Sequence, residues 1–96
     1  MLNFSHVKST YPIVDEVARH VGASNIFRQK KDKFLTCCWL HKEDTPSMMV
    51  NADTNTYRCF GCGQVGTIID VRCFFMGLNP RNGADVYKAV AAIVGE

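Results

Sequence analysis

Two closely spaced pairs of side chains that bind soft or borderline metal ions stand in the middle of this chain. They form a C-x-x-H pair and a C-x-x-C pair separated by seventeen residues, and they consist of Cys38 and His41, then Cys59 and Cys62. Each pair can occupy one tight turn, and two such turns together supply the four ligands of a tetrahedral Zn²⁺. Strand-like residues precede both pairs, as in a zinc ribbon. The spacing therefore predicts one structural zinc ion held by these four residues.

Cys37 directly precedes Cys38 and competes with it as a ligand. Neighbouring residues of a strand point to opposite faces, so only one of the two thiols can face the metal. We expect Cys38 to be the ligand, because its spacing to His41 matches the spacing of the second pair. Cys73 stands among apolar residues and is expected to be a core thiol.

The size and composition of the chain agree with a structural metal. It has 96 residues, five cysteines and a formal net charge of +2. In a domain this small a hydrophobic core alone supplies about 3–5 kcal/mol, and zinc binding would add the rest. The odd number of cysteines, an N-terminus unlike a signal peptide and the lack of a long apolar run favour the reducing cytoplasm over a secreted or membrane protein.

Three helices are predicted around a zinc-ribbon core. The first covers about 12–21, where Pro12 suits the first turn and Gly22 ends an apolar stripe. The second covers about 67–76 and begins with a capping box of Thr67 and Asp70, and the third covers about 83–94. The core spans about 25–66, with short strands in 25–37 and 47–60. The expected fold is a single α+β domain over residues 1–96, a small zinc ribbon whose antiparallel sheet is flanked by about three helices.

Several short blocks around the ligand pairs are more specific than the spacing. They are Cys38-Trp-Leu-His41, Thr45-Pro46-Ser47, Cys59-Phe60-Gly61-Cys62-Gly63 and Gly66, in this order. This series resembles the zinc-binding domain of DnaG-type bacterial and phage primases, and the resemblance covers nearly the whole chain. It implies a non-catalytic module of a DNA primase. Such a module helps a separate catalytic domain to engage single-stranded DNA template during RNA primer synthesis in DNA replication.

Basic and aromatic residues lie close to the ligand pairs and suggest contact with nucleic acid. Cations can bind phosphates and exposed rings can stack on bases. The candidate nucleic-acid-binding residues are Arg28, Lys30, Lys31, Lys33, Trp39, Tyr57 and Arg58. Arg72 also lies near the second pair. A solvated hairpin tip would explain the cluster at 28–33 equally well, and the resemblance to primases favours DNA.

Two other classes of function remain as alternatives. A free-standing zinc ribbon could mediate protein–protein contacts in a replisome, for example with a helicase or a polymerase subunit. For the primase module, the expected partners besides single-stranded DNA are a primase catalytic domain and a replicative helicase. His41, Glu43 and the second cysteine pair also resemble the motif of zinc-dependent nucleobase deaminases. However, Arg58 stands at that motif's proline position, and four protein ligands leave no open coordination position for water. We therefore expect no catalytic residues on this chain.

Overall fold

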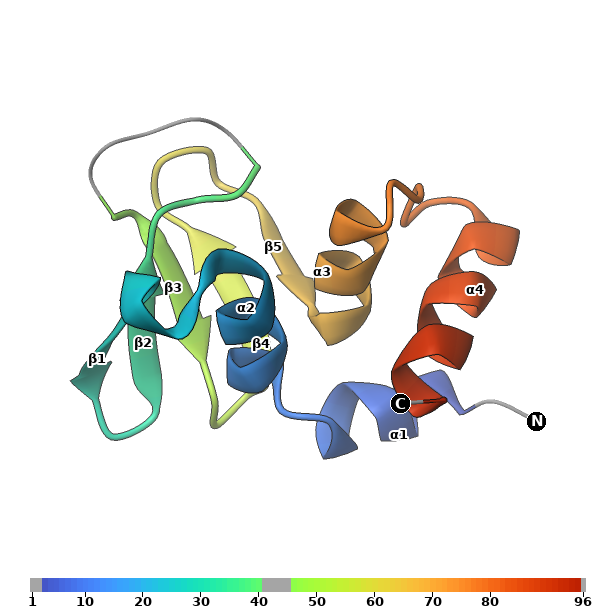
Figure 1. Ribbon diagram of the computed structural model, residues 1–96, viewed down its shortest axis with the longest axis horizontal. Helices are drawn as coiled ribbons and strands as arrows, with labels where there is room; N and C mark the ends of the chain where they lie inside the picture. Colours follow the sequence, from blue (N-terminus) through green and yellow to red (C-terminus); the bar gives the residue numbers. More distant parts are fainter. Residues whose placement is uncertain (1–2, 41–45, 96) are drawn as a thin grey trace.

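The computed structural model describes residues 3–40 and 46–95, which form a five-stranded antiparallel sheet and four α-helices (Figure 1). The elements in chain order are α1 (Phe4–Thr10), α2 (Ile13–Val21), a 3-10 turn (Ala23–Asn25), β1 (Ile26–Lys30), β2 (Lys33–Thr36), β3 (Met48–Asn51), β4 (Thr56–Cys59), β5 (Val65–Thr67), α3 (Ile68–Phe75) and α4 (Gly83–Val94). The α+β class with an antiparallel sheet is confirmed. The sequence did not indicate α1, which begins where the Asn3 side chain accepts a hydrogen bond from the backbone N–H of His6.

The strands follow one another in the sheet in chain order, so each pairs with its sequence neighbours. Residues that face each other across this antiparallel ladder lie on the same face, and the register therefore separates two faces. The buried face carries Thr36, Met48, Val50, Tyr57 and Cys59. Helix α2 lies in front of this face in Figure 1 and contacts β3.

The opposite face, which we call the open face, has no helix over it among the described elements. One row of paired residues crosses all five strands here and consists of Phe27, Leu35, Met49, Arg58 and Val65. Phe27 is 52% exposed and Val65 is 64% exposed. A sheet with one face packed and one face solvated explains this alternation of buried and exposed residues.

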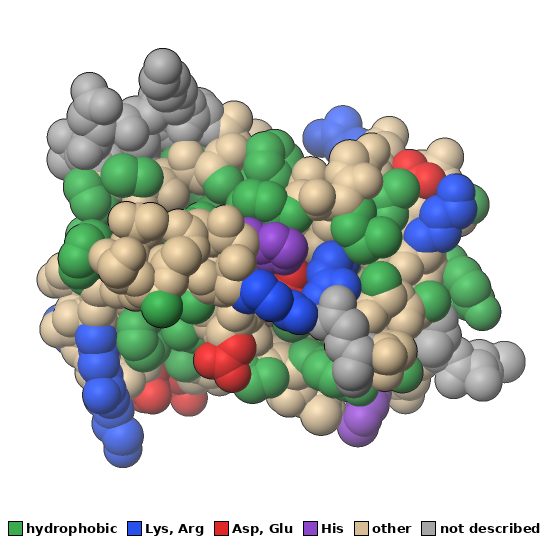
Figure 2. Space-filling view, in the orientation of Figure 1, with side chains coloured by type: hydrophobic (Ala, Val, Ile, Leu, Met, Phe, Trp, Pro, Cys, Tyr) green, Lys and Arg blue, Asp and Glu red, His purple; other side chains and the backbone are tan. Residues whose placement is uncertain are grey.

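A buried ion pair joins α2 to α3. The Glu16 carboxylate, 2% exposed, accepts hydrogen bonds of 2.8 Å from Nε and from one terminal nitrogen of Arg72, which is 4% exposed. Arg19 and His20 also contact this carboxylate, and the His20 ring stacks on Phe75 with centroids 4.2 Å apart. Figure 2 shows acidic, basic and histidine side chains gathered at this junction. Arg72 is therefore a core residue and not a surface cation near the candidate metal ligands.

Electrostatics keep Glu16 ionised in this buried place. Burial by itself raises the pKa of the carboxyl group. Hydrogen bonds from Arg72 and His20, together with the charges of Arg72 and Arg19, outweigh burial and hold the pKa of Glu16 below its usual range. The ion pair thus adds a link between α2 and α3 to the direct contact of α3 with β5. None of the described helices is long and apolar enough to cross a membrane.

Candidate metal centre

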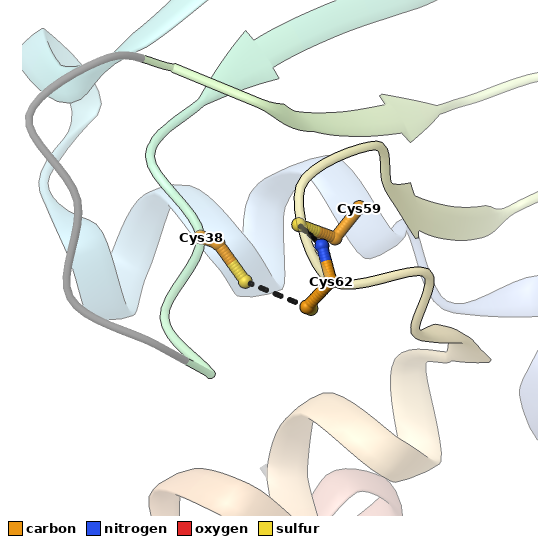
Figure 3. Close-up of side chains that lie close together, drawn as sticks. All are labelled: Cys38, Cys59 and Cys62. Carbon is orange, nitrogen blue, oxygen red and sulfur yellow. Dashed lines mark hydrogen bonds between the residues drawn. The ribbon is translucent and has the colours of Figure 1, made fainter.

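Three thiols from two separate loops converge at one end of the sheet (Figure 3). Cys38 follows β2, Cys59 ends β4, and Cys62 lies in the loop from β4 to β5. Their sulfur atoms all lie within 4.8 Å of one another, and those of Cys38 and Cys62 are 3.9 Å apart. In a tetrahedral zinc site with Zn–S bonds of about 2.3 Å, two sulfurs are about 3.8 Å apart. The number, softness and separation of these donors therefore fit a zinc ion.

The cluster in the described part of the chain contains Cys38 and not Cys37, which is half-buried. Cys73 is fully buried, and burial raises the pKa of its thiol. His41 and Glu43 lie outside the described residues.

Hydrogen bonds to sulfur prepare the thiols for a metal. The backbone N–H of Leu40 donates to Sγ of Cys38, and the N–H of Cys62 donates to Sγ of Cys59, each at 3.4 Å. The Ser47 hydroxyl also lies 3.4 Å from Sγ of Cys59. Such donors stabilise the thiolate, which is the form that binds metal. Burial raises the pKa of Cys59, but these hydrogen bonds and the neighbouring thiols lower it to about 7.

Ser47 has a role that ligand spacing did not reveal. Its carbonyl accepts a hydrogen bond of 2.9 Å from the N–H of Phe60, while its hydroxyl meets the Cys59 sulfur. Ser47, which follows the first ligand pair in the chain, is thus hydrogen-bonded to the segment that carries the second pair. The T-P-S block was the sequence signal for this interaction.

The loop that carries Cys62 depends on glycine. Gly63 has φ +76°, a conformation that side chains with a Cβ rarely adopt, and its N–H donates to the carbonyl of Cys59 at 2.8 Å. The N–H of Cys59 in turn donates to the carbonyl of Gln64 at 2.8 Å. These bonds fold the chain back after Cys62 and direct both thiols of the second pair to the same side.

Comparison with known proteins identifies the family. Residues 3–95 match the family model described as the CHC2 zinc finger, the zinc ribbon of DnaG. The chain belongs to this family. Its relatives include the DNA primase of Lactococcus lactis, 33% identical over 93% of this chain, and that of Escherichia coli K12, 35% identical over 69% of it. The chain spans only 13% and 11% of these two proteins, so what it shares with them is one module of a primase.

A solved structure has the same fold. The zinc-binding and RNA polymerase domains of Aquifex aeolicus primase match 95% of this chain and 20% of the other, with a TM-score of 0.75 and 22% identity. The resemblance to primases expected from the sequence is thereby confirmed. The family and the cysteine cluster together make this chain a primase-type zinc finger.

The predicted DNA-binding residues of this zinc finger divide between the two faces of the sheet. Lys33 and Arg58 lie on the open face and line one shallow depression together with Phe60. The Arg58 guanidinium lies 5.6 Å from the centroid of the Phe60 ring, which is 64% exposed. The structure therefore brings two predicted cations together with an exposed ring that the predicted set did not include.

The remaining predicted cations lie at the β1–β2 hairpin. Arg28, Lys30 and Lys31 are all exposed there. Arg28 donates a hydrogen bond of 3.0 Å to the carbonyl of Lys31 and lies 6.0 Å from the centroid of Phe34. These residues extend the positive charge from the open face to the hairpin.

The two predicted stacking residues face the helices instead. Tyr57 is only 6% exposed, and Trp39 meets it edge-on with centroids 5.1 Å apart. Trp39 also lies 6.0 Å from the centroid of Phe75 in α3. Burial raises the pKa of Tyr57 to about 12, with further contributions from Asp70, Cys38 and Cys62. Tyr57 thus has little ring surface for a base. The exposed ring beside Arg58 and Lys33 belongs to Phe60, and the exposed Phe27 lies on the same face in β1.

Proposed function

We propose that this chain binds one structural Zn²⁺ through Cys38, His41, Cys59 and Cys62. The convergence of three thiols, with sulfur-directed hydrogen bonds already in place, carries this proposal. With four protein ligands, the ion is closed to substrate and links the two loops, so metal binding contributes to folding.

Cobalt substitution tests the ligand set. Cys38→Ser should remove the intense thiolate-to-cobalt absorption of one sulfur and weaken zinc binding at least about a hundredfold, since structural zinc sites contribute about 10–16 kcal/mol. Cys37→Ser is the matched control and should keep the wild-type spectrum. Weakened binding in Cys37→Ser with an intact Cys38→Ser site would show that the other thiol is the ligand.

The zinc-stabilised domain recognises single-stranded DNA template for a primase during primer synthesis. The open face supports this function, because it offers Arg58 and Lys33 for phosphates and Phe60 and Phe27 for bases on an uncovered sheet. Lys30 and Lys31 add charge at the hairpin end of the same surface.

Binding of short single strands to the zinc-loaded chain at low salt tests the DNA role. Arg58→Ala and Lys33→Ala should weaken binding for every base sequence, and the slope of log K against log salt should fall by about 0.7 for each phosphate that the variant no longer neutralises. Phe60→Ala should cost about 1–3 kcal/mol if a base stacks there. Lys88→Ala removes an exposed charge from α4 and should have little effect.

The module acts with partners. Tethering to a primase catalytic domain raises its effective concentration at the template, which makes weak binding by the module sufficient. A replicative helicase is a second partner in this proposal, and the cytoplasm is the expected compartment. If the folded zinc form binds no single strand and the Arg58 and Lys33 variants leave priming by the complete primase unchanged, the DNA role fails and a protein-contact role of the same face replaces it.

A further inference from the structure

A cleft between β5 and α3 lies beside the candidate metal centre and has no role in the function proposed above. It has a volume of about 340 Å³, which is within the usual range of small-ligand sites. Its walls come from the loops next to the two ligand pairs, from α3, and from the connection between α3 and α4. In Figure 1 this connection lies on the same side of the molecule as the loop between β4 and β5. We call it the β5–α3 cleft.

Two polar groups converge on one wall of this cleft. Gly66 is paired with Tyr57 in the sheet, and its missing side chain leaves room for both groups. A Cβ on Gly66 would lie 2.6 Å from the Tyr57 hydroxyl and 2.8 Å from Oδ2 of Asp70. The backbone N–H of Thr67 donates to the same Oδ2 at 2.8 Å, so the carboxylate has a defined orientation. Glycine at this position thus allows a hydroxyl and a carboxylate to stand together.

The other walls are apolar or basic. Phe74 is 43% exposed and Val65 is 64% exposed, although both are large apolar residues at the cleft. The exposed Arg81 supplies a cation on the side of the α3–α4 connection. The cleft therefore combines a hydrogen-bond acceptor, the Asp70 carboxylate, with a cationic donor, the Arg81 guanidinium. The side chains of Phe74 and Val65 add two apolar surfaces.

The cleft continues the open face. Val65 faces Arg58 across the β4–β5 ladder, so the row of residues that crosses the sheet ends at the edge of the cleft. If a single strand of DNA lay along the row from Phe27 to Val65, the nucleotide following the one at Val65 would reach the cleft.

The charges indicate which part of a nucleotide fits. The Asp70 carboxylate repels a phosphate, whereas it accepts hydrogen bonds from the amino group of a base. The Arg81 guanidinium donates to base oxygens and ring nitrogens. Guanine, adenine and cytosine all carry an exocyclic amino group, and thymine has none. Guanine alone has a ring N–H beside its amino group, so it can donate two hydrogen bonds to one carboxylate while its O6 and N7 accept from a guanidinium.

We propose that the β5–α3 cleft receives one base of the single-stranded template, with Phe74 and Val65 against its face and Asp70 and Arg81 at its edge, and that it prefers guanine to thymine. This inference rests on the proposed DNA role and adds base selectivity to it. The open face binds any sequence, and the cleft discriminates at one position.

Fluorescence anisotropy with the zinc-loaded full chain tests the inference. The probes are an oligothymidine and the same strand with a single central dG, dA or dC. The dG strand should bind at least about fivefold more tightly than oligothymidine, the lower end of what one good base contact provides. Arg81→Ala and Asp70→Asn should each abolish this preference, measured as the ratio of dG-strand affinity to oligothymidine affinity. Asp70→Asn retains an acceptor for the Thr67 N–H, and circular dichroism checks that both variants are folded.

The controls separate the cleft from the open face. Lys88→Ala, which removes a positive charge on α4 outside the cleft, should keep both affinity and preference. Arg58→Ala should weaken all strands equally. Equal binding of all four strands by the wild type, or a preference that survives in Arg81→Ala and Asp70→Asn, overturns the cleft inference and leaves the DNA role intact. Absence of binding to any strand overturns both.

Discussion

Replacing Glu16 by Gln tests whether the buried ion pair between α2 and α3 holds the two halves of the domain together. The substitution preserves the shape of the side chain and removes its charge, which leaves the Arg72 guanidinium buried at 4% exposure without this counter-charge. Breaking one side of a buried ion pair costs about 3–5 kcal/mol, mainly because the remaining charge is poorly solvated. Arg19 is about half-exposed, so its contact with Glu16 adds little to this figure.

The expected loss is large relative to the stability of the domain. A chain of 96 residues has an unfolding free energy of about 5–14 kcal/mol, so Glu16→Gln should remove at least about a fifth of it. Urea denaturation of the zinc-saturated protein at pH 7, followed by circular dichroism, measures the change. Asp15→Asn is the control, because it removes an exposed carboxylate one residue away on the same helix and should cost about 0.5 kcal/mol.

The pH dependence has a definite sign. The pKa of Glu16 is lower in the folded protein than in the unfolded chain, so its stabilisation is fully present above about pH 4.3 and is lost as the pH falls through the folded value. The difference between wild type and Glu16→Gln should therefore be large at pH 7 and shrink below about pH 5. Because both proteins have the same candidate zinc ligands, the difference isolates the carboxylate.

Two results would refute this reasoning. One is a loss below about 1 kcal/mol in Glu16→Gln, which would mean that Arg72 rehydrates at little cost. The other comes from replacing both residues of the pair by methionine. The double variant should be more stable than Glu16→Met alone, because the buried guanidinium that loses this carboxylate is then absent as well. Equal or lower stability would show that packing, and not charge pairing, determines the effect.

Two further substitutions probe the turns that position the sheet. Asn55 has φ 57°, and its side chain ties the β3–β4 turn to the start of α2. It accepts a hydrogen bond from the Ile13 N–H and donates to the carbonyls of Lys8 and Tyr11. In urea denaturation, Asn55→Ala should therefore lower the free energy of unfolding by about 2–4 kcal/mol. Asn55→Gly keeps the backbone conformation and should show the hydrogen-bond part alone. Gly66→Ala should cost about 1–3 kcal/mol of stability, because the added Cβ would crowd Tyr57 and Asp70. A Cβ added at Gly83 would have nothing within 4 Å, so Gly83→Ala is the control and should be neutral. Equal shifts of the melting temperature in both variants would contradict the crowding.

Local rules of the sequence were enough for the class of fold and for bringing together three of the four candidate ligands. Ligand spacing is a local property, because each pair sits on one tight turn, and the structure places Cys38, Cys59 and Cys62 together. The helix beginning after Thr67 could be predicted because Asp70 accepts from the Thr67 N–H within a single turn. The short sequence motifs between Cys38 and Gly66 indicated the family for a similar reason, because they too can be recognised along one continuous stretch of chain.

The tertiary structure decided what distant segments do to one another. Arg72 and Tyr57 appear in the sequence as a cation and a ring near the second ligand pair, but Glu16 from α2 draws Arg72 into the core, and Trp39 and α3 cover Tyr57. Sheet register determined that Arg58, and not Tyr57, shares a face with Phe27 and Val65, because alternation along a strand gives two faces without saying which one a helix will cover. The pairing of Tyr57 with Gly66 that opens the β5–α3 cleft likewise depends on strands meeting across the sheet, an arrangement that spacing along the chain does not specify.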